Sequence, residues 1–272
     1  MPIQTFDQRS PSLLSPGPIR AFWRSALRLS VLLLLLSASP AVAWTPESQN
    51  EIALDAARLA PPDLYRQLSR NRAAFLQGVQ EPFRDGAPPE SPGQLEAAIH
   101  QAIQNAQLAI ELHRPFNEIA YRLGVVSHFL AHANDPLATD DSDPAEPRIR
   151  NDFRRYLAST EPRVRVVFYG FHPDFDDQND VARLLRRTLE RGRGFYPLVG
   201  REYRRIGFGS GVRGFDDRST AYAVASLARS HAVSDIAEVL RYIWLESGGI
   251  DTRPRVPWRG ERVVQIQGSS SR

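Results

Sequence analysis

The chain has 272 residues but no cysteine, no lysine and only one methionine. The absence of cysteine excludes disulfides, thiolate zinc sites, iron–sulfur clusters and cysteine nucleophiles. The absence of lysine makes arginine the source of all 34 basic side chains. The sequence also lacks a glycine-rich phosphate loop and a Gly-x-Ser-x-Gly nucleophile elbow. Any metal in this protein must therefore be held by histidine, carboxylate or backbone groups.

The first 43 residues are typical of a secretory signal peptide. Arginines precede an apolar run at residues 31–36, and small residues ending at Ala43 follow it as a cleavage site requires. The apolar run is shorter than the roughly 20 residues that span a bilayer, so a permanent anchor is the weaker interpretation. Cleavage after Ala43 makes Trp44 the amino-terminal residue. The sequence thus predicts a periplasmic or secreted protein with no permanent membrane span.

The positive charge of the chain belongs to this leader. The formal net charge is +3, and the sequence pI is near 9.5. The leader carries four arginines and one aspartate, so residues 44–272 hold 30 basic and 30 acidic side chains. Such a balanced chain offers no bulk attraction to nucleic acid, whose non-specific binding depends on positive charge. Nucleic acid is therefore the less favoured partner, and the arginine clusters at 183–193 and 201–205 are interpreted as solvated helix faces.

Residues 44–250 predict one all-α domain, a multi-helix bundle, and residues 251–272 predict a flexible tail. The predicted helices cover residues 46–60, 63–75, 94–112, 116–133, 178–191, 197–205 and 219–247. Glycine and proline indicate a loop at 78–93, and an acidic, proline-containing stretch indicates a surface loop at 135–147. Residues 164–169 are rich in β-branched side chains. This pattern is the only one in the chain with strand character, and it is equally compatible with a buried helical turn.

The histidines carry the chemical signal in this chain. His128 and His132 are four residues apart, so their imidazoles share one face of a helix. His231 and Asp235 have the same spacing on a later helix. Neutral imidazole and carboxylate are the usual zinc ligands, and two such pairs on facing helices make a site in a bundle core. A histidine in a helix is more often a surface or core residue, so the spacing alone leaves a structural role open.

Residues 123–139, LGVVSHFLAHANDPLAT, resemble the His-x3-Asp helix and Pro-Leu loop of the zinc-dependent phospholipase C and single-strand nuclease superfamily. Mature members begin with a tryptophan directly after the signal peptide, and its terminal amine and carbonyl bind zinc; Trp44 stands in that place. The segment FLQGVQEPFRDG contains Asp85 and is followed by His100, which is similar to a further motif of the superfamily. His231 and Asp235 fit its later His-x3-Asp or Glu pair. The resemblance extends from residue 44 to about residue 247 and implies the superfamily's helical fold.

The sequence also departs from the superfamily pattern. An expected early histidine is absent from the region of Gln49 and Asn50, and Ala138 stands where the Pro-Leu loop has a histidine. His132 replaces a metal-bridging aspartate, and imidazole binds only one metal per ring nitrogen; Asp135 is the nearest substitute. The resemblance therefore implies one or two zinc ions and not three. Its implied ligands are Trp44, Asp85, His100, His128, His132 and Asp135, with a second, weaker ion at His231 and Asp235.

The resemblance implies a metal-dependent phosphodiesterase that hydrolyses a phospholipid or another phosphodiester with a zinc-activated water. Asp85 is then the catalytic carboxylate. Two alternatives stay open on the sequence. The first is a non-catalytic relative that keeps the helical fold with at most one structural metal, and the second is a single-strand nuclease.

Overall fold

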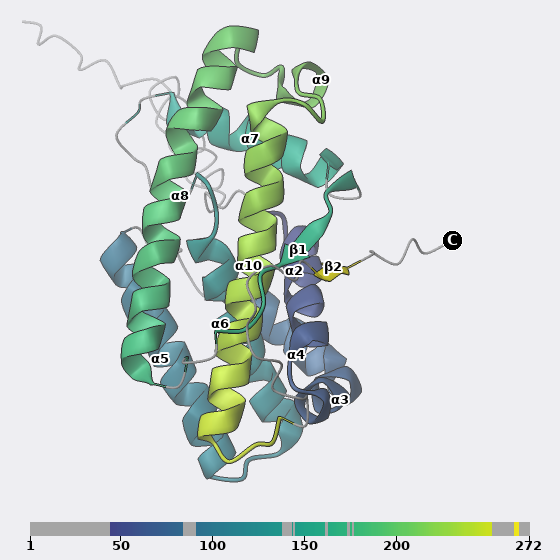
Figure 1. Cartoon of the computed structure of the whole chain (residues 1–272), viewed down its shortest axis with the longest axis vertical. Coiled ribbons are helices and arrows are strands. Elements are labelled where there is room, and N and C mark those ends of the chain that lie inside the picture. Colours follow the sequence, from purple (N-terminus) through teal and green to yellow (C-terminus); the bar gives the residue numbers. More distant parts are fainter. Residues whose placement is uncertain are drawn as a thin grey trace, which may run out of the picture. The chain divides into compact units, whose positions relative to one another are not determined.

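The computed structural model describes residues 44–83, 91–137, 143, 145–160, 163–172, 175, 177–251 and 264–266. Helices predominate among them, which confirms the predicted all-α fold (Figure 1). The elements are α2 (Pro46–Leu59), α3 (Pro62–Arg70), α4 (Arg72–Gln80), a 3-10 turn (Glu81–Phe83), α5 (Pro92–Glu111), α6 (Phe116–Ala133), α7 (Glu146–Thr160), β1 (Val166–Phe168), α8 (Gln178–Ile206), α9 (Gly211–Gly214), α10 (Thr220–Glu246) and β2 (Val264–Ile266). The predicted signal peptide, Asp85, Ala138 and most of the predicted tail lie outside the described residues. No described helix is long and apolar enough to cross a membrane.

Side-chain caps set where several helices begin. Thr45 accepts a hydrogen bond from Ser48 N at 3.1 Å and so caps α2, whose first residue is a proline. Ser91 with Gln94 forms a capping box on α5, and Asp177 with Asp180 does the same on α8. These short-range signals depend on neighbouring residues only, which is why sequence patterns locate the starts of α2 and α5 closely.

The helices α4 and α6 cross with their backbones in close contact. Gly78 was assigned to a loop but lies inside α4, where a Cβ would reach the Gly124 Cα of α6 at 3.1 Å. A Cβ on Gly124 would in turn lie 2.9 Å from Val79 N. The two glycines let the helix backbones touch, and this contact places the Val79 carbonyl against the side chains of α6. The predicted loop at 78–93 was therefore wrong in its first residues.

Three other helical segments also differ from the prediction. The helix expected at 63–75 is two helices, because the chain breaks at Asn71. α8 runs unbroken through Pro197, whose ring lies on the exposed side of the helix. α7 was not predicted, although Ile149, Phe153 and Tyr156 are buried at helical spacing on it.

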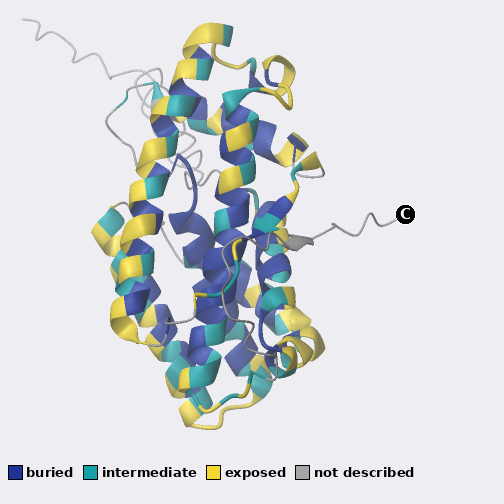
Figure 2. Ribbon diagram, in the orientation of Figure 1, coloured by how far each residue is buried: buried dark blue, intermediate teal, exposed yellow. Residues whose placement is uncertain are grey.

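α10 is the buried centre of the described fold. It contacts α2, α5, α6, α8 and β1, and Figure 1 shows it running beside α8. Most of its residues are buried, whereas exposed residues follow the outer side of α8 (Figure 2). A helix that is covered on several sides has apolar or small residues on all of its faces, and α10 has buried small residues such as Ala228 and Ala232.

Side chains of α10 hold the β1 segment in place. Ser230 Oγ accepts from Val167 N at 3.1 Å, Ser234 Oγ accepts from Tyr169 N at 3.2 Å, and Glu238 Oε2 accepts from His172 N at 2.8 Å. The three acceptors are four residues apart, so they form one stripe along the helix. Among the described residues, β1 pairs with β2 in an antiparallel arrangement, in which Val166 lies opposite Ile266. Of the two interpretations left open for residues 164–169, the structure has the strand, with its bounds at Val166 and Phe168.

Candidate functional site

His128 is fixed by a backbone contact from α4. It is buried, and its Nδ1 lies 2.9 Å from the Val79 carbonyl oxygen. Because a carbonyl oxygen only accepts, Nδ1 donates the proton and Nε2 keeps its lone pair. Burial lowers the pKa of His128 to about 4, and the hydrogen bond to Val79 opposes only part of that shift. The imidazole is therefore neutral at neutral pH, in the form that ligates a metal.

His132 lies one turn later on the same face and is also buried. Its Nδ1 is enclosed by protein and makes no hydrogen bond within the part of the chain that the structure describes. Burial, followed by the charges of His128 and Arg150, lowers the pKa of His132 to about 3. A buried ring nitrogen without a partner is costly unless something satisfies it, so this atom marks a place for a ligand.

Trp44 contacts the turn of α6 that carries His132, and Gln49 is a buried polar residue of α2. Trp44 is buried, and its Nε1 donates to the carbonyl oxygen of Ala131, next to His132, at 3.0 Å. Gln49, on the first turns of α2, is fully buried, and neither of its amide atoms has a partner among the described residues. Trp44, the predicted amino-terminal residue after signal cleavage, therefore lies beside the histidine turn.

Asp135 is inside the protein and not in a surface loop. It follows α6 directly, is fully buried, and its Oδ1 accepts from Leu137 N at 2.8 Å. Its charge also favours the protonated Arg154 guanidinium, although burial still lowers the pKa of Arg154. The prediction of a surface loop at 135–147 was wrong at its start, because Asp135 and Leu137 are buried and the Asp135 carboxylate finds its hydrogen-bond donor inside the protein.

The second predicted pair lies in a different environment. Asp235 is buried, and its Oδ2 accepts hydrogen bonds from Thr188 Oγ1 at 2.8 Å, Asn134 Nδ2 at 3.1 Å and Arg191 Nη2 at 2.7 Å. Burial raises the pKa of Asp235, while Arg191 and the other hydrogen bonds lower it. His231 stacks on Tyr169 with ring centroids 4.5 Å apart. Burial, followed by the Arg191 charge, lowers the pKa of His231 to about 4.

His100 is on α5, half-exposed, with its Nε2 4.0 Å from Glu96 Oε1. It lines a small hollow with residues of α8 and α10, including Gln178 and Tyr242. In the described part of the chain it makes no hydrogen bond or ion pair with His128 or His132. Over the same residues, no group of three or more histidine, aspartate and glutamate side chains comes together as a metal site. Asp85, the remaining side chain of the predicted set, lies outside them.

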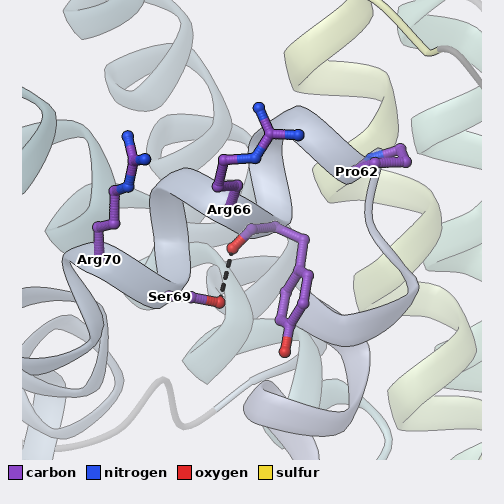
Figure 3. A pocket seen from close by; sticks show the side chains of 5 residues that line it. Pro62, Arg66, Ser69 and Arg70 are labelled. Carbon is purple, nitrogen blue, oxygen red and sulfur yellow. Dashed lines mark hydrogen bonds between the residues drawn. The ribbon is translucent and has the colours of Figure 1, made fainter.

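A wider hollow of about 430 Å³ lies over α3, and no histidine lines it. Pro62, Tyr65, Arg66, Ser69 and Arg70 line it, and Figure 3 shows that these side chains come from a single helix. Ser69 Oγ donates to the Tyr65 carbonyl at 2.8 Å. The hollow is formed by one exposed helix and has no buried polar group, so we assign it no role.

The sequence interpretation missed the groups that surround Asp235. Arg191 was included in a cluster interpreted as solvated, yet only 23% of its side chain is exposed and it bonds Asp235. Thr188 is three residues earlier on α8, and Asn134 caps the end of α6. The i, i+3 spacing of Thr188 and Arg191 gives a weak local signal, but their common partner Asp235 lies 44 residues beyond Arg191 in the sequence.

The helices and these contacts can be compared with known proteins. The fold resembles that of Clostridium perfringens alpha-toxin. A crystal structure of alpha-toxin from an avian strain matches with a TM-score of 0.52 and 11% sequence identity, over 79% of this chain and 67% of that chain. At this identity the likeness shows the fold alone, and it agrees with the predicted helical fold of the phospholipase C type. No protein-family model and no curated protein sequence matches the chain.

Proposed function

We propose that this protein is an exported, metal-dependent phosphodiesterase of the phospholipase C type, acting on a phospholipid or a related phosphodiester. The observation that carries the proposal is the buried pair of neutral imidazoles, His128 and His132, beside Trp44 in a fold that resembles alpha-toxin. His132 Nδ1 has no partner among the described residues, as a ligand atom that awaits a cation would. Alpha-toxin is itself a phospholipase C.

In this proposal one zinc ion is held by His128 Nε2, by His132 Nδ1, by the terminal amine and carbonyl of Trp44, and by Asp85. A zinc ion bound there would lower the pKa of its bound water molecule and would stabilise negative charge on the phosphoryl oxygens of the substrate. The Val79 carbonyl keeps His128 in the tautomer whose Nε2 is a donor to metal, which is the usual role of a partner behind a ligand histidine. Burial keeps both imidazoles unprotonated across the neutral range.

The test begins with protein recovered from the periplasm, whose amino terminus mass spectrometry should place at Trp44. Elemental analysis without added zinc is expected to give one ion per chain. Turnover is expected on a phosphocholine ester and not on single-stranded DNA. Turnover of DNA alone would support a nuclease and contradict the phospholipid substrate.

Substitution His132→Gln is expected to remove the bound zinc and to lower turnover by about 100-fold or more, because it removes a ligand that neighbouring groups cannot replace. His113→Asn is the matched control, since His113 is exposed beyond the end of α5 at a positive φ that asparagine tolerates. Far-UV circular dichroism confirms that each variant is folded. Equal zinc content in His132→Gln and in the control would contradict the assignment of His132 as a zinc ligand.

A non-catalytic relative is the second candidate. The ion pair between Asp235 and Arg191 favours it, because that carboxylate already has a positive partner. Its expected result is at most one ion per chain, with no turnover of either substrate and with a melting temperature that falls when the metal is removed.

A further inference from the structure

The residues around Asp235 do not suit a metal ion. Its Oδ2 already accepts from Thr188, Asn134 and Arg191, and the Arg191 guanidinium repels a cation at this place. His231 does not join this network and stacks on Tyr169 instead. A bound cation would have to displace a buried, charge-assisted hydrogen bond of 2.7 Å. The positive charge that a second ion would bring is therefore supplied by an arginine.

Arg191 is held from one side only. Its Nη2 donates to Asn134 Oδ1 at 3.0 Å, to Thr188 Oγ1 at 3.2 Å and to Asp235 Oδ2 at 2.7 Å. These acceptors lie at the end of α6 and on α8 and α10, so the Nη2 end of the guanidinium is held in place before any ligand arrives. Nε and Nη1 make no hydrogen bond within the described residues, and the side chain is 23% exposed. The unused edge of the guanidinium is thus available to a ligand.

Two more polar groups lie in the field of this guanidinium. The charge of Arg191 lowers the pKa of both His231 and Tyr169, although burial is the larger influence on each and raises that of Tyr169. Tyr169 is 43% exposed, so its ring is accessible from solvent. Arg187, one turn before Arg191 on α8, is exposed and adds positive charge on the same face. A neutral imidazole, a phenol and a fixed guanidinium offer hydrogen-bond donors and a positive charge to an oxyanion.

We propose that Arg191, His231 and Tyr169 form a binding site for the phosphoryl group of a phosphate ester, with the guanidinium in the place of a second metal ion. A planar guanidinium binds phosphoryl oxygens through two parallel hydrogen bonds, and a rigidly held one loses little freedom on binding. The network links this site to the metal-binding turn, because Asn134 is two residues after His132. Its use in turnover rests on the proposed function, but anion binding does not require turnover.

Calorimetric titration of the mature protein with inorganic phosphate and with phosphocholine tests the site. Arg191→Gln is expected to weaken binding about tenfold or more, because a charge-assisted pair is lost. Arg193→Gln removes the same charge from an exposed residue of the same helix and is expected to stay within about twofold. Tyr169→Phe removes a hydroxyl that also interacts with Ser230, and it is expected to weaken binding about threefold while the protein stays folded.

The variants also separate this site from the metal site. His132→Gln is expected to weaken phosphate binding less than Arg191→Gln does, whereas loss of binding in His132→Gln and not in Arg191→Gln would place the anion on the metal and overturn the proposal. Equal losses in Arg191→Gln and Arg193→Gln would also overturn it, since they would indicate bulk charge. Arg191-dependent binding without any turnover would support this site while contradicting the proposed phosphodiesterase. Tighter binding of phosphocholine than of phosphate would identify an ester and not free phosphate as its ligand.

Discussion

Gly78 and Gly124 show how much a single missing side chain determines here. They allow the backbones of α4 and α6 to touch, and that contact delivers the Val79 carbonyl to His128. In most helix interiors glycine is less stable than alanine by about 1 kcal/mol. At this crossing the order reverses, because an added Cβ has no space.

Gly124→Ala is expected to lower the free energy of unfolding by about 2–3 kcal/mol or more, because its Cβ would meet the α4 backbone, with Val79 N at 2.9 Å. Gly194→Ala is the control, since a Cβ at this exposed position of α8 has nothing within 4 Å. It is expected to stabilise the protein by up to about 1 kcal/mol. Urea unfolding measures both. A Gly124→Ala variant as stable as Gly194→Ala would contradict the close crossing.

At the scale of elements, α10 supplies hydrogen-bond acceptors to the β1 segment in addition to the strand partner β2. Ser230, Ser234 and Glu238 receive backbone N–H groups from the β1 segment, so residues 167–172 are tied to a helix. Glu238 is the acidic member of this stripe. Burial raises the pKa of Glu238 to about 7, while the His172 hydrogen bond and Arg241 oppose the shift.

This raised pKa predicts a pH-dependent stability. The folded protein holds the Glu238 proton up to about pH 7 while the unfolded chain releases it near 4.5, so the contribution of Glu238 is full below pH 4.5 and is lost as the pH rises through 7. The free energy of unfolding of wild type is therefore expected to fall from pH 5 to pH 8 relative to that of Glu238→Gln. The expected change in the difference between the two proteins is of the order of 2 kcal/mol. Chemical denaturation at both pH values measures it. Glu246→Gln, at an exposed position of α10, should show no such change, and equal pH slopes for wild type and Glu238→Gln would refute the prediction.

For the whole molecule, a buried ion pair joins the first described helix to the last. Arg229 of α10 donates to Asp55 of α2 at 3.2 Å, and both side chains are only 9% exposed. Asp55 also binds Arg58 at 2.6 Å, but the Arg58 side chain is 38% exposed. The two arginines share one carboxylate and differ in burial, which makes them a natural comparison.

Arg229→Met is expected to lower the free energy of unfolding by about 2–4 kcal/mol, because it removes a desolvated charge partner from a buried carboxylate. Arg58→Met is expected to lower it by less than about 1 kcal/mol, since solvent screens an exposed pair. Thermal and urea unfolding of the two variants provide the measurement. Equal losses would show that burial does not set the strength of these pairs.

The sequence by itself determined the features that depend on neighbouring residues. The start of α2 follows from Thr45 and Pro46, the pair His128 and His132 follows from helical spacing, and the helical class follows from apolar periodicity. It placed Gly78 in a loop because glycine usually breaks a helix, and it placed Asp135 at the surface because acidic residues usually lie there. Both rules describe averages that close packing overrides.

Only the tertiary structure decided which partners those residues have. Asp235 was predicted to bind a metal, and Arg191 was predicted to face solvent, but the fold brings them to 2.7 Å from different helices. Asn134 and Thr188 complete that network from two further places in the sequence. No local pattern encodes such a meeting, because it depends on how α6, α8 and α10 pack. Helical periodicity states which side chains share a face, whereas packing alone states what that face meets.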